Sequence, residues 1–208
     1  MAVLLLSVLL AALVGVPQAA GQSEALKDPS QLKETAPDIF RARFETNGGP
    51  FVIEVHREWA PAGADRFYNL VKNGFYDGTR FFRVRPGFMA QWGLNGDPAI
   101  QRAWQAAPLR DDPVTQSNMR GFVSFTNEDR PISRFTQVFI NYVDNSFLDK
   151  QGFAPFGQVV SGMEVVDKLY SYGKEKEPDQ RRILRDGNDY LQKEYPRLGF
   201  VKKASIAK

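Results

Sequence analysis

FFRVRPGFMAQWG, from Phe81 to Gly93, is the most informative stretch of this sequence. It places two arginines, Arg83 and Arg85, among aromatic and aliphatic residues, with a Pro-Gly turn near its middle. The short apolar runs on either side of the turn favour β-strands. Two charges in so apolar a stretch lie either on the solvent face of a strand or in a site whose chemistry needs them.

Similar short runs extend along most of the chain. IFRARFET, which begins at Ile39, and FVIEVH, which ends at His56, alternate apolar and polar residues around the turn NGG, and this predicts a β-hairpin. Many short strands with few helices predict a mainly β fold, either a closed antiparallel barrel or a sandwich. Further strands are expected over 80–84, 88–92, 122–125, 137–141, 156–160 and 200–206, and helices over 60–74, 162–173 and 179–195.

The composition indicates one ordinary globular domain. With 208 residues, 43% of them hydrophobic, the chain can bury one substantial core. A net charge of +3 is too small to indicate a nucleic-acid binder. RGFVSF (120–125) begins like an RNA-binding motif, but it has Val123 and Ser124 where that motif needs a small residue and Phe. No nucleic-acid partner is therefore expected.

The N-terminal residues are typical of an export signal. Residues 1–21 carry no charged side chain, are apolar from Ala2 to Val16 and end in small residues spaced like a cleavage site. They are short for a bilayer span, so we expect a cleaved signal, a periplasmic or secreted protein and no stable membrane span afterwards. An uncleaved anchor is the first alternative, and a wrongly assigned start of the sequence is the second. Residues 22–37, which are polar, are expected to form a linker, and residues 38–207 the single domain.

The available side chains exclude most catalytic chemistries. His56 is the only histidine and there is no cysteine, so a Cys-His site is impossible and a Ser-His-Asp site would depend on one strand-end residue. The acidic residues Asp111, Asp112, Asp144 and Asp149 lack the spacing of a calcium loop, and no P-loop or dinucleotide motif occurs. Neither a metal nor another cofactor is expected. What remains is a site of arginine, amides and apolar rings.

Such a site suits rotation about an X-Pro peptide bond. This reaction needs no proton transfer and no nucleophile. The enzyme only has to lower an activation barrier of about 18–20 kcal/mol, which amide resonance sets. In the twisted transition state the prolyl nitrogen regains its lone pair, so a guanidinium aimed at it stabilises the transition state more than either ground state. An acceleration of about 10⁵-fold requires only about 7 kcal/mol. Arginine fits the role because it stays charged at any working pH.

The stretch from Phe81 to Gly93 resembles the cyclophilin motif. It keeps the motif positions Arg83, Pro86, Gly87, Phe88, Met89, Gln91 and Gly93. Two further blocks, GFVSFTN with FTQVFINYVDNSFLD and FAPFGQVVSGMEVVDKL, are similar to the family's central strands and to its closing strand and second helix. The resemblance, from about Ile39 to Ile206, implies a closed eight-stranded antiparallel barrel capped by two helices, with the site on its outer face. The helix at 179–195 would be an addition before the last strand.

The resemblance also implies roles for individual residues. Arg83 would be the catalytic guanidinium, and Gln91 would orient it and the substrate carbonyl. Asn127 would pair with the substrate chain through its backbone, and Gln137 would support the pocket floor. We therefore expect a catalytic set of Arg83, Gln91, Phe88 and Phe139 and a substrate-binding set of Phe82, Met89, Phe125, Thr126, Asn127, Gln137, Phe147, Leu148 and Phe153.

Several positions depart from the family pattern. Phe147 stands where drug-sensitive members have Trp, so cyclosporin binding is expected to be weak. Phe153 replaces the pocket histidine, and Phe82 replaces a histidine beside Arg83, which leaves that arginine with one neighbour fewer. Arg85 falls at a usually aliphatic position, so its stem is expected to pack and its charge to reach solvent.

The sequence thus predicts an exported, bacterial-type cyclophilin. It would isomerise X-Pro bonds in unfolded or flexible proline-containing polypeptides and assist the folding of exported proteins, without a cofactor. The alternative is a non-catalytic peptide-binding or chaperone module on the same fold; the presence of Arg83, Gln91 and Phe139 favours the enzyme. No role is predicted for residues 94–119 or for the helix at 179–195.

Overall fold

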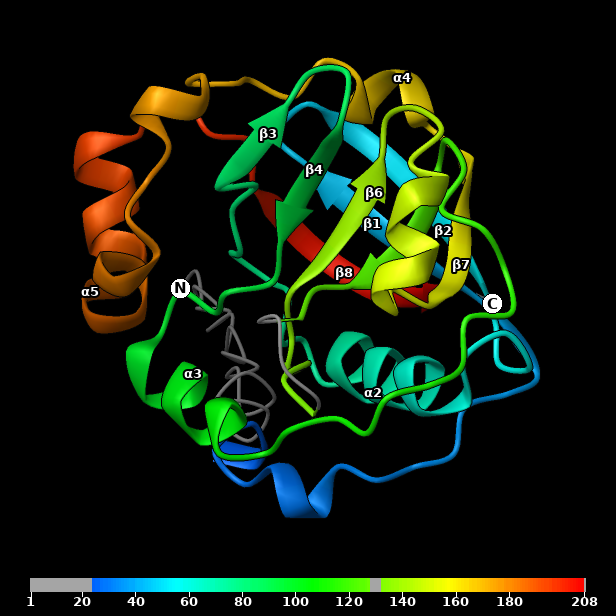
Figure 1. The fold of residues 1–208 in the computed structure, drawn as a ribbon. Coiled ribbons are helices and arrows are strands. Elements are labelled where there is room, and N and C mark those ends of the chain that lie inside the picture. The colour runs from blue at the N-terminus through cyan, green and yellow to red at the C-terminus, as the bar shows by residue number, and fades with distance from the viewer. Residues whose placement is uncertain (1–23, 128–131, 208) are drawn as a thin grey trace, which may run out of the picture.

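The computed structural model describes residues 24–127 and 132–207, whose strands form one antiparallel sheet (Figure 1). The spatial order of the strands is β3-β4-β6-β5-β7-β2-β1-β8. The predicted strands are all present, with ends that differ by a few residues. Their bounds are β1 Ile39–Thr46, β2 Gly49–His56, β3 Arg83–Arg85, β4 Met89–Trp92, β5 Phe122–Phe125, β6 Val138–Asn141, β7 Pro155–Ser161 and β8 Val201–Ala207.

The sheet curls so strongly that its two ends meet. The chain just before β3 bonds to the start of β8: the Phe81 amide donates to the Gly199 carbonyl at 2.9 Å, and the Val201 amide donates to the Thr79 carbonyl at 2.9 Å. These bonds pair backbone groups that an open sheet would leave exposed at its edges. The predicted eight-stranded antiparallel barrel is thus confirmed.

Aromatic side chains fill the interior of the barrel. The β1–β2 hairpin pairs Ile39 with His56 and Thr46 with Gly49, as its alternation predicts. This register turns Phe44 inward, where its fully buried ring lies 5.0 Å from that of Phe51 and 5.8 Å from that of Trp92. Because the interior is packed, a binding site has to lie on the outside of the barrel.

Two helices cover opposite ends of the barrel (Figure 1). Helix α2, Pro61–Lys72, begins where the Asp112 carboxylate accepts the amides of Ala62 and Gly63, at 2.9 and 2.8 Å. Helix α4, Met163–Val166, is a single turn, so the helix predicted over 162–173 is wrong in its length. The Val166 carbonyl accepts the Tyr142 hydroxyl at 2.8 Å, and the chain beyond leaves helical geometry to bond with the β3 edge.

Two more helices pack together beside the barrel. Helix α3, Pro98–Gln105, was not expected, whereas α5, Gln180–Glu194, confirms the predicted C-terminal helix. Gly187 interrupts α5 with a positive φ of 59°, and a Cβ there would lie 2.1 Å from the Gly96 carbonyl oxygen. Only glycine allows this close approach. The apolar face of α5 covers one group of barrel-side residues, namely Phe82, Leu94 and Leu198.

The described part of the predicted linker packs against the domain. The Trp104 indole donates to the Leu26 carbonyl at 2.8 Å, and the Asn69 amide donates to the Glu34 carbonyl at 2.7 Å. A short 3₁₀ turn, η1, spans Pro29–Gln31. The predicted signal over 1–21 lies outside the described residues, and the domain boundary at residue 38 stays a prediction. None of the helices within 24–127 and 132–207 has the length and apolar character of a membrane span.

Candidate active site

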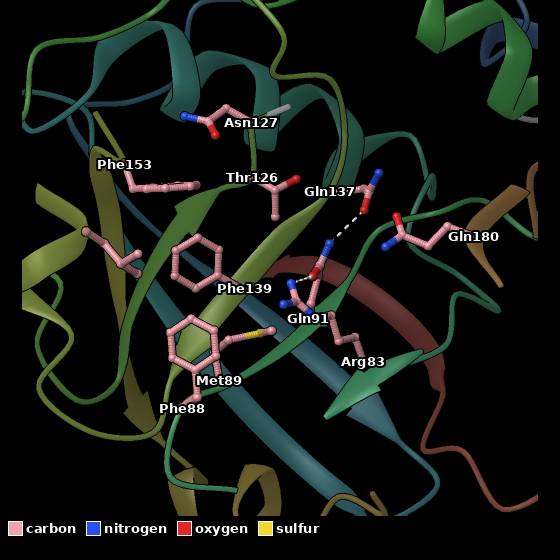
Figure 2. Close-up of a pocket in the computed structure, with 11 residues that line it drawn as sticks. Arg83, Phe88, Met89, Gln91, Thr126, Asn127, Gln137, Phe139, Phe153 and Gln180 are labelled. Carbon is pink, nitrogen blue, oxygen red and sulfur yellow. Dashed lines mark hydrogen bonds between the residues drawn. The ribbon is translucent and has the colours of Figure 1, made fainter. Parts of the chain in front are cut away.

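A pocket of about 280 Å³ opens on the outer face of the sheet (Figure 2). Strands β3, β4 and β6 form its floor, since alternate residues of these strands point outward. In β4, for example, Met89 and Gln91 line the pocket while Ala90 and Trp92 belong to the core. The pocket is lined by Arg83, Phe88, Met89, Gln91, Thr126, Asn127, Gln137, Phe139, Leu148, Phe153 and Gln180.

The strand register sets three outward residues in a row. Arg83 pairs with Gln91 across β3 and β4, and Gln91 pairs with Phe139 across β4 and β6. Arg83 Nη1 donates to Gln91 Oε1 at 3.0 Å, and Gln91 Nε2 donates to Gln137 Oε1 at 2.8 Å (Figure 2). Gln91 therefore fixes the guanidinium on one side while Gln137 holds the Gln91 amide in place.

Gly93 makes the Gln91–Gln137 contact possible. It has a φ of 101°, and a Cβ there would lie 2.5 Å from the Thr136 carbonyl oxygen. The close approach is completed by a hydrogen bond of 2.8 Å from the Thr136 hydroxyl to the Gly93 carbonyl. The end of β4 can thus lie against the chain that carries Gln137.

The other half of the pocket is apolar. Met89, Phe139 and Leu148 are buried there, and the rings of Phe139 and Phe153 meet edge to face at 5.7 Å. Leu148 belongs to the 3₁₀ turn η2, Ser146–Gln151. A small apolar ring such as that of proline can bind on this surface, with the guanidinium of Arg83 at its polar border.

The electrostatics of the polar half centre on two arginines and one carboxylate. Burial is the main cause that lowers the pKa of Arg83; the charge of Arg85 lowers it further and that of Glu177 opposes both. Arg85 donates to Glu177 through Nε at 2.7 Å and through Nη2 at 2.8 Å. The Arg85 charge was expected in solvent; its side chain is 27% exposed, and the charge is also paired with a carboxylate from a distant segment, which was not expected.

The structure brings together ten of the thirteen predicted site residues. Phe82 instead lies in the apolar cluster beneath α5, and Phe125 lies in the core with its ring 5.1 Å from that of Phe156. Strand alternation explains Phe125, which shares the inner face of β5 with Val123. Phe82 precedes β3, and the packing of α5 over it explains its place. Phe147 is 55% exposed and stacks on Phe88 at 6.2 Å, outside the pocket lining. The predicted weak binding of cyclosporin stays a prediction.

Gln180 lines the pocket although the sequence did not point to it. It is the first residue of α5, and no local motif links it to the β3–β4 stretch. The single histidine is elsewhere: His56 stacks on Trp59 at 4.1 Å and lies 3.0 Å from a Glu54 oxygen. In the described parts of the chain no three acidic or histidine side chains gather as a metal site.

The barrel and the pocket together define a class of protein. The family described as cyclophilin type peptidyl-prolyl cis-trans isomerase/CLD matches residues 41–187. The chain belongs to this family and is a peptidyl-prolyl cis-trans isomerase of the cyclophilin type.

Individual relatives agree with this assignment. The chain is 39% identical over 130 residues to a peptidyl-prolyl cis-trans isomerase of Acinetobacter baylyi, covering 60% of this chain and 69% of the relative. It is 35% identical over 134 residues to peptidyl-prolyl cis-trans isomerase B of Escherichia coli, covering 61% of this chain and 81% of the relative. A crystal structure of a Cryptosporidium parvum cyclophilin shares the fold, with a TM-score of 0.61, 20% identity and coverage of 82% of this chain and 98% of that one. A second structure, in the presence of the dipeptide Ala-Pro, has a TM-score of 0.59, 20% identity and coverage of 81% and 99%.

Proposed function

We propose that the isomerase acts through Arg83 on X-Pro bonds of unfolded or flexible polypeptides. The observation that carries the proposal is the placement of a guanidinium, fixed by Gln91, at the border of an apolar pocket. The prolyl ring binds against Phe139, Met89 and Leu148, which are buried side chains with little freedom to move. The Ala-Pro dipeptide named with the Cryptosporidium cyclophilin supports proline-containing peptides as the ligand class.

The geometry suits stabilisation of a twisted amide. Nη1 of Arg83 is bonded to Gln91, and Nη2 has no hydrogen-bond partner among the described residues, so Nη2 is available to the substrate. As the amide twists, the prolyl nitrogen becomes a better acceptor, and the donor binds it most strongly at the transition state. A charge-assisted hydrogen bond contributes about 1.5–3 kcal/mol, and a partly desolvated, preorganised site increases this value.

The alternative is a peptide-binding module without catalysis. A chymotrypsin-coupled assay on a short X-Pro peptide separates the two functions, because only an enzyme raises the rate of the slow cis-to-trans phase. The expected result is an acceleration proportional to protein concentration. Binding of the peptide with no change in that phase would support the module instead.

The rate is expected to be nearly flat between about pH 6 and about pH 9. Burial lowers the pKa of Arg83, which would favour the neutral form at high pH, but an arginine starts so high that it keeps its charge over this range. The single histidine lies against Trp59, away from the pocket lining. The measurement is kcat/KM at constant ionic strength; a bell-shaped profile would mean that an acid or base takes part.

We propose further that the protein works on exported polypeptides. The support is the uncharged apolar stretch at residues 1–21, which ends in small residues. Expression of the full chain in a bacterium with fractionation, followed by N-terminal sequencing, tests the proposal. We expect a periplasmic or secreted product that begins near residue 20 to 22. A cytoplasmic product that still begins at Met1 would contradict it.

A further inference from the structure

Glu177 and Gln180 lie beside the pocket although they come from a distant part of the chain. Glu177 follows the 3₁₀ turn η3, Lys174–Lys176, and Gln180 begins α5. The Arg85–Glu177 contact joins residues 92 positions apart. The segment Glu177–Gln180 therefore borders the site from the side of β3, opposite the apolar half.

Glu177 lies between two like charges. Arg83 and Arg85 are two residues apart on β3 and share its outer face, so their guanidinium groups repel each other. Glu177 binds Arg85 with both carboxylate oxygens, and its Oε2 lies 3.8 Å from Arg83 Nε. The Glu177 side chain is only 17% exposed, so water screens this interaction less than at the surface.

The Arg83 guanidinium is consequently hydrogen-bonded on one side and faces a carboxylate 3.8 Å away on another. Gln91 accepts from Nη1, and the Glu177 carboxylate faces Nε. Nη2 makes no hydrogen bond to the described residues, and Nε has only the longer ion-pair contact with Glu177. The two contacts thus orient the planar fork so that a fixed edge is left for the substrate.

The segment that carries Glu177 is firmly anchored. Pro178 is buried, and the Asp179 carboxylate accepts the Arg181 amide at 2.8 Å, which caps α5. The Asp179 amide donates to the Tyr190 hydroxyl at 3.1 Å, and the Asn188 amide donates to the Gly96 carbonyl at 3.1 Å. A carboxylate on so constrained a segment can hold an arginine at a defined angle.

Gln180 extends the polar half of the pocket. Its amide lies near Gln137 and Gln91 at the end occupied by Arg83, as Figure 2 shows. The residue is exposed, so a polypeptide that crosses the pocket can reach it. A glutamine amide donates and accepts hydrogen bonds, which suits an uncharged polar group of the polypeptide.

We propose that the segment Glu177–Gln180 forms one side of the active site and contributes to both catalysis and substrate binding. Glu177 is a positioning residue for Arg83, and Gln180 binds a polar group of the substrate next to the proline, which makes it a specificity-determining residue. This inference rests on the proposed role of Arg83.

The first test concerns Glu177. Glu177→Gln keeps the size of the side chain and removes its charge, and Glu175→Gln is the matched control on an exposed glutamate of the same loop. We expect kcat to fall about tenfold in Glu177→Gln with KM little changed, because a displaced donor weakens transition-state binding. Glu175→Gln should keep the wild-type rate. The double variant Arg85→Gln/Glu177→Gln should recover part of the loss, because the repelling charge beside Arg83 is gone.

The second test concerns Gln180. Gln180→Ala is compared with Gln192→Ala, an exposed glutamine on the same helix. The substrates are X-Pro peptides that carry either glutamine or leucine in the positions flanking the proline. We expect Gln180→Ala to reduce the preference for the glutamine peptides about threefold, through KM, as the loss of one hydrogen bond would do. Gln192→Ala should leave the preference unchanged.

The outcomes separate the inference from the proposed function. A wild-type protein without isomerase activity would overturn the proposed function and the inference with it. An active wild-type protein whose Glu177→Gln variant matches Glu175→Gln, and whose Gln180→Ala variant matches Gln192→Ala, would overturn the inference alone. A loss in Glu177→Gln that is equal in the double variant and accompanied by a lower melting temperature would show a structural role and would also overturn it.

Discussion

Replacing Arg83 with alanine is expected to lower kcat/KM by about 10²- to 10³-fold, the range typical for loss of one preorganised donor. The substitution removes the only cationic donor among the residues described as lining the pocket. The apolar half remains, so peptide affinity should change much less than kcat. The chymotrypsin-coupled assay and a peptide titration measure the two quantities separately.

Two further variants make this result specific. Arg83→Lys keeps the charge but loses the planar fork that Gln91 holds, so most of the loss should persist. Arg43→Ala removes an arginine whose side chain is 46% exposed on β1, and it should leave the rate unchanged. If Arg83→Ala isomerises as fast as the wild-type protein, the mechanism proposed here is wrong.

Replacing Phe44 with alanine is expected to lower the free energy of unfolding by about 3–5 kcal/mol. Phe44 is fully buried, and its ring contacts four others at centroid distances of 5.0 to 6.0 Å: Phe51, Phe67, Tyr76 and Trp92. These rings come from β2, β4, α2 and the turn after α2. Removing the Phe44 ring would therefore leave a cavity at a point where several elements pack together. Urea unfolding followed by Trp fluorescence and by circular dichroism measures the change.

The matched control lies on the same strand. Ile39 is 58% exposed, and Ile39→Ala should change the free energy of unfolding by no more than about 0.5 kcal/mol. A comparably small loss in Phe44→Ala would show that the surrounding rings close the cavity, contrary to the rigid core inferred from the packing.

Local sequence patterns predicted most of the sheet, because strand alternation and the position of each turn depend on residues that are close in sequence. The alternation of IFRARFET and FVIEVH determines which residues face the core, and the NGG turn sets the register that pairs Ile39 with His56. The Pro-Gly turn between β3 and β4 likewise places Arg83 opposite Gln91. Short-range constraints of this kind are readable in a sequence.

Long-range contacts were not predictable in the same way. Helix α4 ends where the Tyr142 hydroxyl donates a hydrogen bond to the Val166 carbonyl, and no local sequence pattern predicts this contact. The pairing of Arg85 with Glu177 and the position of Gln180 at the pocket depend on how α5 packs over Phe82. The neighbours of a residue across the barrel depend on the whole fold, so the ion pair of Arg85 with Glu177 was not predicted.

The order of the strands has a consequence for when the protein becomes active. Within the described residues β8 is the last strand, and it pairs with β1, the first, from Arg41–Ala207 to Thr46–Val201. The sheet therefore stays incomplete until both ends of the chain have been synthesised. Glu177 can contact Arg83 only after the C-terminal part of the chain has been made. A chain that crosses a membrane from its N-terminus would complete its sheet only when its passage is almost finished, because β1 has β2 on one edge but lacks β8 on the other until then.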